Sequence, residues 1–320
     1  MFDINEKATK LSPSTGVVFH SVTAKLLYVA IRAPMDLLTA TSFLTTCVSK
    51  STHQDLAKLK RLLEYISGSL DDEYVIGADD LGRLLRTWVD ASYAVHPDCK
   101  SHTGGAMSFG TGALVCKSSK QKLNTKSSTE AELVGANNFL PCIIWVKMLL
   151  GAQGYNVHTN ILEQDNESAI RLEKNGRTSA GPKLRHINIR YFWLTKDRVA
   201  SEGITIRHCP TLQMLADFFT KPLQGTLFKR FKAVLLGHQH IGTLSAVVVE
   251  PLEERVGDKR PGSRDDIVRE YNTGTGAPTV PTSKREAKAT YADVEKGWLR
   301  IRLIVETRFF QVLILLKESR

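Results

Sequence analysis

Cysteine is scarce in this 320-residue sequence, and its five cysteines never form a Cys-x-x-Cys pair. An odd number of scattered cysteines argues against a disulfide framework, and the missing pairs argue against a zinc knuckle. A reducing, intracellular environment fits this usage best. Residues 1–7 contain no basic stretch followed by an apolar one, so we expect no signal peptide.

Long uninterrupted apolar runs are also missing. The most apolar stretches are cut by charged residues, near the N-terminus at Lys25 and Arg32 and near the C-terminus at Arg302 and Glu306. None reaches the ~18 apolar residues that a membrane-spanning helix needs. Acidic residues are outnumbered, with 33 Asp and Glu against 43 Lys and Arg, which gives a net charge of +10. This excess indicates a polyanionic partner, but charge alone does not choose between nucleic acid and an anionic membrane.

The overall composition is that of a globular protein. Hydrophobic residues make up 42% and charged residues 24% of the chain, which excludes a wholly disordered, collagenous or coiled-coil protein. The sequence divides into three segments. Residues 1–80 are predicted to be helical, with apolar helices at 22–28 and 35–48 and an amphipathic helix at 56–66 that ends near Gly68.

Residues 84–237 alternate between strand and helix patterns, which predicts a mixed α/β sheet domain. The long helix begins near Ser128, the predicted N-cap, and Pro141 is expected to kink it. Residues 238–320 are predicted to be a largely disordered tail, because no apolar period survives at 250–290. The predicted strands are 84–93, a hairpin at 104–115, 160–164 and 204–208, and the predicted helices are 131–150, 168–174, 184–200 and 212–219.

Four acidic residues of the middle segment form a candidate metal site: Asp90, Glu132, Asp165 and Asp217. Ionised carboxylates among apolar neighbours are costly unless a cation pairs with them. Oxygen-only ligands favour Mg²⁺ or Mn²⁺, and two such ions can clamp a phosphodiester. Each acid also has an ordinary interpretation, as a strand-end cap, a helix-dipole partner, a turn residue and a helix-face acid respectively.

Seven short sequence words surround these acids in a fixed order. The middle segment resembles, nearly from end to end, the ribonuclease H domain of copia-type (Pseudoviridae) retrotransposon polyproteins. The words that carry the resemblance are residues 88–94 (WVDASYA), 101–105 (SHTGG), 118–122 (SSKQK), 127–132 (SSTEAE), 164–169 (QDNESA), 185–191 (RHINIRY) and 216–223 (ADFFTKPL).

The resemblance implies a ribonuclease H-like fold, a five-stranded mixed sheet flanked by helices. It also implies that Asp90, Glu132, Asp165 and Asp217 are both the catalytic residues and the metal ligands. Glu132 is preferred to Glu130 because its Glu-Leu-Val-Gly context matches the family's helix. The implied reaction cuts the RNA strand of an RNA–DNA hybrid with two Mg²⁺ or Mn²⁺ ions per site.

A second group of residues near the predicted site is expected to contact nucleic acid. A solvated loop remains the alternative for its lysines, and a structural hydrogen bond remains the alternative for its histidine. The group consists of Lys120, Lys122, Lys126, Ser128, Gln164 and His186.

The first segment carries the resemblance too, since residues 19–28 and 59–66 look like the thumb and connection of the same reverse transcriptases. No Tyr-Val-Asp-Asp polymerase motif occurs, so we expect no DNA synthesis from this chain alone. The expected partners are an RNA–DNA hybrid and the missing reverse transcriptase fingers and palm, with no membrane. The family implies cytoplasmic virus-like particles, with the nucleus as the alternative location. Two alternative functions stay open: an inactive nucleic-acid-binding remnant of a truncated polyprotein, and an interaction protein unrelated to nucleic acid.

Overall fold

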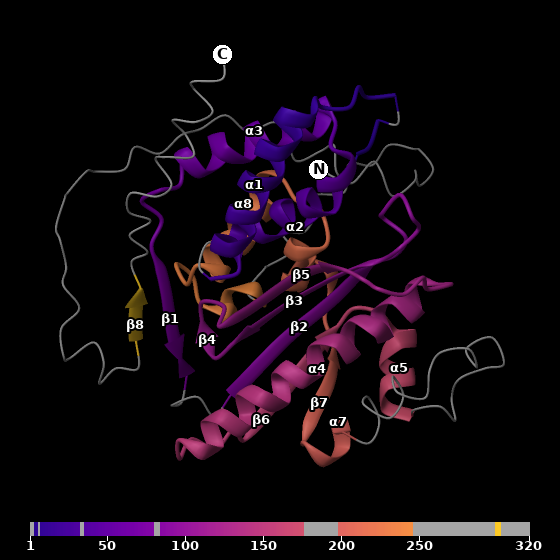
Figure 1. The fold of residues 1–320 in the computed structure, drawn as a ribbon. Coiled ribbons are helices and arrows are strands. Elements are labelled where there is room, and N and C mark those ends of the chain that lie inside the picture. Colours follow the sequence, from indigo (N-terminus) through magenta and orange to yellow (C-terminus); the bar gives the residue numbers. More distant parts are fainter. Residues whose placement is uncertain are drawn as a thin grey trace, which may run out of the picture.

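A five-stranded mixed sheet lies at the centre of the protein (Figure 1). The computed structural model describes residues 3–5, 7–32, 35–79, 84–175, 198–245 and 298–301. The strand order is β5-β3-β2-β6-β7; β3 pairs antiparallel with β2 and β5, whereas β6 is parallel to both β2 and β7. The strands predicted at 84–93, 160–164 and 204–208 are confirmed as β2 (Leu84–Ser92), β6 (Thr159–Gln164) and β7 (Ile204–His208). The hairpin predicted at 104–115 is longer, because β3 (His102–Ser108) pairs with β5 (Val115–Lys120).

Helices cover both faces of this sheet, and a pair of glycines lets them approach closely. Helices α4 (Ser128–Ala152) and α5 (Glu167–Asn175) pack on one face. A Cβ atom on Gly105 would lie 2.5 Å from the ring of Phe139 in α4. On the opposite face, a Cβ atom on Gly104 would lie 2.7 Å from the Cβ atom of Phe219. Consecutive residues of a strand face opposite sides of the sheet. Gly105 therefore allows the close approach of α4 on one side, and Gly104 allows the close approach of the Phe219 segment on the other.

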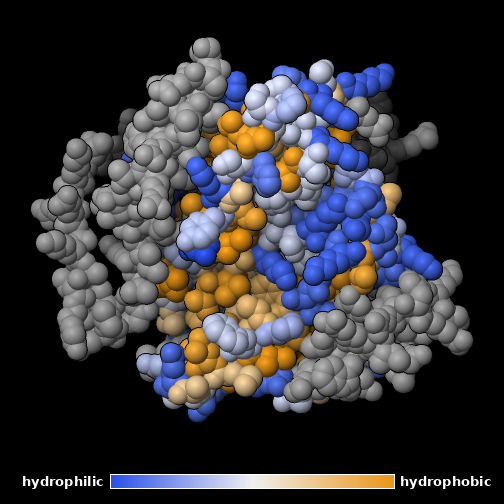
Figure 2. Space-filling model, viewed as in Figure 1, coloured by the Kyte–Doolittle hydropathy of each residue, from blue (hydrophilic) through white to orange (hydrophobic). Residues whose placement is uncertain are grey.

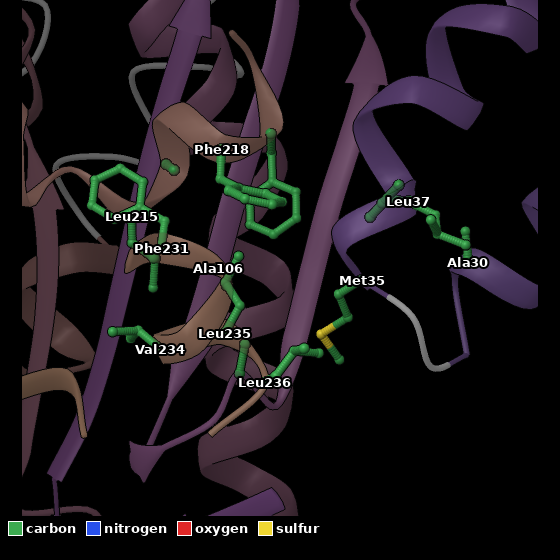
Figure 3. Packing of buried hydrophobic residues seen from close by; sticks show 14 of the residues in the cluster. Ala30, Met35, Leu37, Ala106, Leu215, Phe218, Phe231, Val234, Leu235 and Leu236 are labelled. Carbon is green, nitrogen blue, oxygen red and sulfur yellow. The ribbon is translucent and has the colours of Figure 1, made fainter. Parts of the chain in front are cut away.

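The second layer joins the N-terminal helices to the C-terminal part of the sheet domain. One buried apolar cluster includes Ala30, Leu37, Ala106, Phe218 and Phe231, which come from far-separated parts of the sequence (Figure 3). This core includes residues from both sides of position 80. The domain boundary predicted near residue 80 stays a prediction. The elements of this layer are α1 (Pro13–Ala30), η1 (Met35–Leu37), α2 (Leu38–Cys47), α3 (His53–Ser67), η8 (Leu215–Phe219) and α8 (Gly225–Leu235).

A smaller sheet has the order β4-β1-β8. Its strands are β4 (Gly110–Thr111), β1 (Tyr74–Ala78) and β8 (Trp298–Ile301). The segment 238–320 thus contributes β8, and its short helix η9 (Ile241–Leu244) buries apolar side chains. The remainder of that segment, from 246 to 297 and from 302 onward, lies outside the described residues.

Helix α4 differs from the sequence prediction at its start. Its N-cap is Ser127, whose hydroxyl accepts from the Glu130 N–H, so the prediction of Ser128 was one residue late. The helix continues through Pro141, and the kink predicted there stays a prediction. Among the described residues, α4 is the one helix with the length and apolar composition of a membrane span, and it packs on the sheet as a core helix does.

The outer side of α4 remains apolar near its C-terminal end (Figure 2). Trp145 is 60% exposed and Met148 is 67% exposed there.

The predicted helix at 212–219 is two short 3-10 helices, η7 (Thr211–Gln213) and η8. Of the predicted helix at 184–200, only its end is described, as α7 (Arg198–Ser201).

Candidate metal centre

Three of the four predicted acids meet at one end of the central sheet. Asp90 lies near the end of β2, and Asp165 directly follows β6. Trp88 pairs with Glu163 in the parallel register, so Asp90 and Asp165 both lie two residues beyond that pair. Asp217 comes from η8, which packs against β2 and β3. Carboxylate oxygens of the three aspartates lie within 4.8 Å of one another.

The segment that carries Asp217 is fixed by three hydroxyl groups from three different elements. The Thr39 hydroxyl of α2 donates to the carbonyl of Phe218 at 2.7 Å. The hydroxyl of Ser118 in β5 donates to the carbonyl of Phe219 at 2.8 Å, and the hydroxyl of Ser92 in β2 donates to the next carbonyl at 3.1 Å. Each bond satisfies a carbonyl that the short 3-10 helix leaves open.

Glu132 lies beside this trio, on the first turns of α4. Its buried carboxyl accepts a hydrogen bond from the backbone N–H of Ala91. Burial, followed by the negative charges of Asp90 and Asp165, raises the pKa of Glu132 well above its ordinary value. The Oε2 atom of Glu132 is buried and has no hydrogen-bond partner among the described residues.

Glu130 has a different environment, although it is also buried. Its carboxylate accepts from the backbone N–H of Lys126 at 2.7 Å, so it serves the start of the helix. Asp90 and Asp165 act electrostatically on Glu132, but the choice of Glu132 over Glu130 as the fourth acid stays a prediction.

Burial and repulsion by neighbouring carboxylates disfavour ionisation of Asp165 and Asp217. The pKa of Asp217 is raised to about 7, first by burial and then by Asp90, while Lys221 opposes the rise. The pKa of Asp165 is also raised, by burial and by Asp90. Three carboxylates that repel one another in a buried setting call for a compensating positive charge.

Two residues that the sequence analysis did not single out supply part of that compensation. The hydroxyl of Thr220 donates to Asp90 Oδ2. The ammonium of Lys221 lies 2.6 Å from Asp217 Oδ1 and 3.9 Å from Asp90 Oδ2. The spacing of four residues between Asp217 and Lys221, typical of ion pairs on one helical turn, was the available signal.

The donor atoms suit a hard divalent cation. The three clustered aspartates offer only carboxylate oxygens, and beside them Oε2 of Glu132 is buried without a partner among the described residues. Such a set favours Mg²⁺ or Mn²⁺ over zinc, which prefers nitrogen and sulfur ligands.

The residues predicted to contact nucleic acid have different environments. Lys122, Lys126 and Ser128 are exposed close to the start of α4. Lys120 forms an ion pair with Asp98 at 2.8 Å. Gln164 is fully buried and its amide donates to Glu173 at 3.3 Å, so its side chain offers no surface to a ligand in this structure. His186 lies outside the described residues.

Comparisons with known proteins point to retrotransposons. No protein-family model matches the sequence. The chain is 28% identical over 225 residues to the retrovirus-related Pol polyprotein from transposon TNT 1-94 of Nicotiana tabacum, a match that covers 70% of this chain and 17% of that protein. It is 29% identical to the corresponding polyprotein from transposon RE1 of Arabidopsis thaliana, covering 70% of this chain and 15% of that protein.

Two solved structures have weaker similarity. LC11-RNase H1, isolated from compost, is 13% identical with a TM-score of 0.31, over 42% of this chain and 91% of that one. The protease-reverse transcriptase of prototype foamy virus is 12% identical with a TM-score of 0.28, over 56% of this chain and 21% of that one. The chain is thus similar to retrovirus-related Pol polyproteins of plant transposons, of which it spans less than a fifth of the length, and its fold is a mixed five-stranded sheet flanked by helices.

Proposed function

We propose that this chain cleaves the RNA strand of RNA–DNA hybrids with the help of two Mg²⁺ or Mn²⁺ ions. The observation that carries the proposal is the meeting of Asp90, Asp165 and Asp217 within 4.8 Å, from three separate elements, with Glu132 beside them. The fold and the homology to Pol polyproteins support a nuclease role of the ribonuclease H kind. Asp90, Glu132, Asp165 and Asp217 would hold the ions.

The protein's own groups set the geometry of the reaction. A bound pair of divalent cations supplies an activated water and charge stabilisation of the leaving 3′ oxygen. Thr220 fixes one oxygen of Asp90, and the N–H of Ala91 fixes Glu132, so these two carboxylates are oriented before any ligand arrives. Because these carboxylates are already oriented, the reaction includes no free-energy cost for reorienting them.

The basic surface supports a nucleic-acid substrate. The net charge of +10 and the exposed Lys122 and Lys126 near the start of α4 would attract the phosphate backbone. Discrimination of RNA from DNA would rest on contacts to the 2′-hydroxyl in the minor groove. The reverse transcriptase fingers and palm are the proposed protein partner, and the cytoplasmic virus-like particle is the proposed location.

The test is cleavage of a labelled RNA–DNA hybrid by the full chain, with Mg²⁺, Mn²⁺ or EDTA. Wild type is compared with Asp90→Asn and with Asp71→Asn, an exposed aspartate remote in sequence from the site. We expect metal-dependent cutting of the RNA strand alone, lost in Asp90→Asn and kept in Asp71→Asn.

Two results would contradict the proposal. Absence of cutting by a folded wild-type chain that still binds the hybrid would favour the inactive nucleic-acid-binding remnant. Absence of both cutting and salt-sensitive binding to any polyanion would favour an interaction protein unrelated to nucleic acid.

A further inference from the structure

Two buried histidines lie close to the segment that carries Asp217. His102 begins β3 and belongs to the sequence word at 101–105, and His96 lies between β2 and β3. Nε2 of His96 lies 3.0 Å from Nδ1 of His102, and Nε2 of His102 lies 2.7 Å from the hydroxyl of Ser118 in β5. That hydroxyl is one of the three anchors of the Asp217 segment. The histidines therefore stand behind an anchor of the candidate metal centre.

Burial keeps both imidazoles neutral. It lowers the pKa of His96 to about 4 and that of His102 to about 3. The charge of Lys120 lowers the pKa of His96 further, whereas that of Asp98 raises it. The ring of His96 also stacks on Phe43 of α2, with 6.1 Å between the ring centroids and 16° between the ring planes. The pair is thus packed in place from the side of the N-terminal helices.

The direction of each hydrogen bond in this chain follows from its last member. The carbonyl of Phe219 can only accept, so the Ser118 hydroxyl donates its single proton there, at 2.8 Å. The Ser118 oxygen must then accept from Nε2–H of His102. Because a neutral imidazole carries one N–H, Nδ1 of His102 accepts from Nε2–H of His96. Three hydrogen bonds therefore run in one direction, from His96 to the Phe219 carbonyl.

The register of the sheet brings this chain of hydrogen bonds to the metal centre. Gly104 pairs with Asp90 of β2 on one side and with Ser118 of β5 on the other, so the three residues form one row across the sheet. The Phe219 segment lies directly over Gly104, which has no side chain. The row thus has a carboxylate of the candidate metal centre at one end and the anchoring hydroxyl at the other.

We propose that His102 is a positioning residue for the nuclease, which fixes the Ser118 hydroxyl and thereby the backbone that carries Asp217. This inference rests on the proposed function, because the placement of Asp217 matters to a chain that uses its carboxylates. A serine hydroxyl rotates freely by itself. The N–H of His102 occupies its acceptor side, so its proton stays directed at the Phe219 carbonyl. Such control matters because a metal site requires its ligands within about 0.5 Å of their working positions.

The first measurement tests the chain of hydrogen bonds in the full protein, without metal or nucleic acid. Long-range proton–nitrogen NMR correlations on protein labelled with ¹⁵N-histidine show which ring nitrogen carries the proton. We expect His96 and His102 to be neutral and protonated at Nε2 from pH 6 to pH 8. His20, an exposed histidine of α1, is the titrating reference. A proton on Nδ1 of His102 in this range would overturn the inference, whatever the activity.

The second measurement is the rate of hybrid cleavage in Mn²⁺, with each variant first shown to be folded by circular dichroism. Two variants of His102 differ by one methylene group. The amide of His102→Gln reaches the position of Nε2 and can still donate to Ser118, whereas the shorter amide of His102→Asn cannot. Ser118→Ala and the double variant His102→Asn/Ser118→Ala complete the series, and His20→Gln is the control.

We expect His102→Asn and Ser118→Ala each to lower kcat about tenfold with KM for the hybrid little changed, because loss of an outer partner typically costs a metal site about 10–100-fold. His102→Gln should keep most of the activity, and His20→Gln should match wild type. The double variant should be no slower than Ser118→Ala, because both changes break the same chain.

The contrary outcomes separate the two proposals. Equal kcat in wild type and His102→Asn, or losses that add up in the double variant, would overturn the role of His102 and leave the nuclease standing. Loss of activity in His102→Gln as large as in His102→Asn would also overturn it, because packing rather than the hydrogen bond would then be the cause. A folded wild type that cuts no hybrid would overturn the proposed function and the positioning role together.

Discussion

Replacement of Asp165 by Asn should separate the stability of the protein from its function. Asp165 is the best probe of the cluster because, unlike Asp90 and Asp217, it makes no ion pair or side-chain hydrogen bond with Thr220 or Lys221. Its pKa is raised by burial and by Asp90, which means that its ionised form is held in the fold at a cost. A neutral amide of nearly the same shape removes that cost.

The size of the effect follows from the distances. Two unit charges 4.8 Å apart, the upper limit of the separations in this cluster, repel by about 3.5 kcal/mol at an effective dielectric of 20. Asp165 is only partly buried and Lys221 offsets part of the negative charge, so we expect Asp165→Asn to stabilise the metal-free protein by about 1 kcal/mol. The measurement is made at pH 8, above the pKa of about 7 for Asp217, so that this carboxylate is mostly ionised.

Urea unfolding at pH 8 measures this difference, first in EDTA and then in Mn²⁺. In EDTA the variant should be the more stable protein. Wild type should gain about 2.7 kcal/mol when free Mn²⁺ is 100 times its dissociation constant, whereas the variant, which has lost a ligand, should gain less. The order of stability should therefore reverse. Lower stability of Asp165→Asn in EDTA, or equal gains from Mn²⁺, would refute the reasoning.

Three further predictions concern the scaffold and use urea unfolding. Gly104→Ala should destabilise the protein by about 1–3 kcal/mol, because its Cβ atom would lie 2.7 Å from the η8 segment, whereas Gly135→Ala, with its nearest contact at 3.4 Å, should be neutral or stabilising. Burial raises the pKa of Glu173 to about 8, so Glu173 should lower the stability of wild type as the pH rises from 4.5 through 8, and Glu173→Gln should make that loss smaller. Ser127→Ala should cost about 1 kcal/mol by removing the cap of α4, and Ser128→Ala, the originally predicted cap, should change stability by less than about 0.5 kcal/mol.

The sheet and three of its acids were predictable because local sequence determines them. The strand patterns place Asp90 and Asp165 at the ends of parallel neighbours, and the parallel pairing of those strands brings them together. The sequence word at 216–223 identified Asp217. Glu132 was assigned from the sequence around it. Its position relative to the three aspartates depends on how α4 packs on the sheet, and no local sequence pattern determines that packing.

Other features depend on tertiary contacts. The 3-10 geometry at 211–219 replaces the predicted helix, because carbonyls in η8 accept from hydroxyls on other elements. His96 and His102 form a buried pair at 3.0 Å, and burial lowers the pKa of His102 to about 3. Trp145 is largely exposed, since the apolar residues of α4 extend around more of the helix than the sheet covers.

The N-terminal helices belong to the physical support of the candidate site. Thr39 of α2 holds the carbonyl of Phe218, the residue next to Asp217, and this bond is buried. Phe218 itself stacks on Phe228 of α8 and lies in the same apolar cluster as α1, α2 and α3. Removal of residues 1–80 would therefore expose this cluster and release one of the three hydroxyl anchors of the Asp217 segment. A metal site of this kind tolerates little displacement of its ligands, so its geometry depends on helices that carry no ligand themselves.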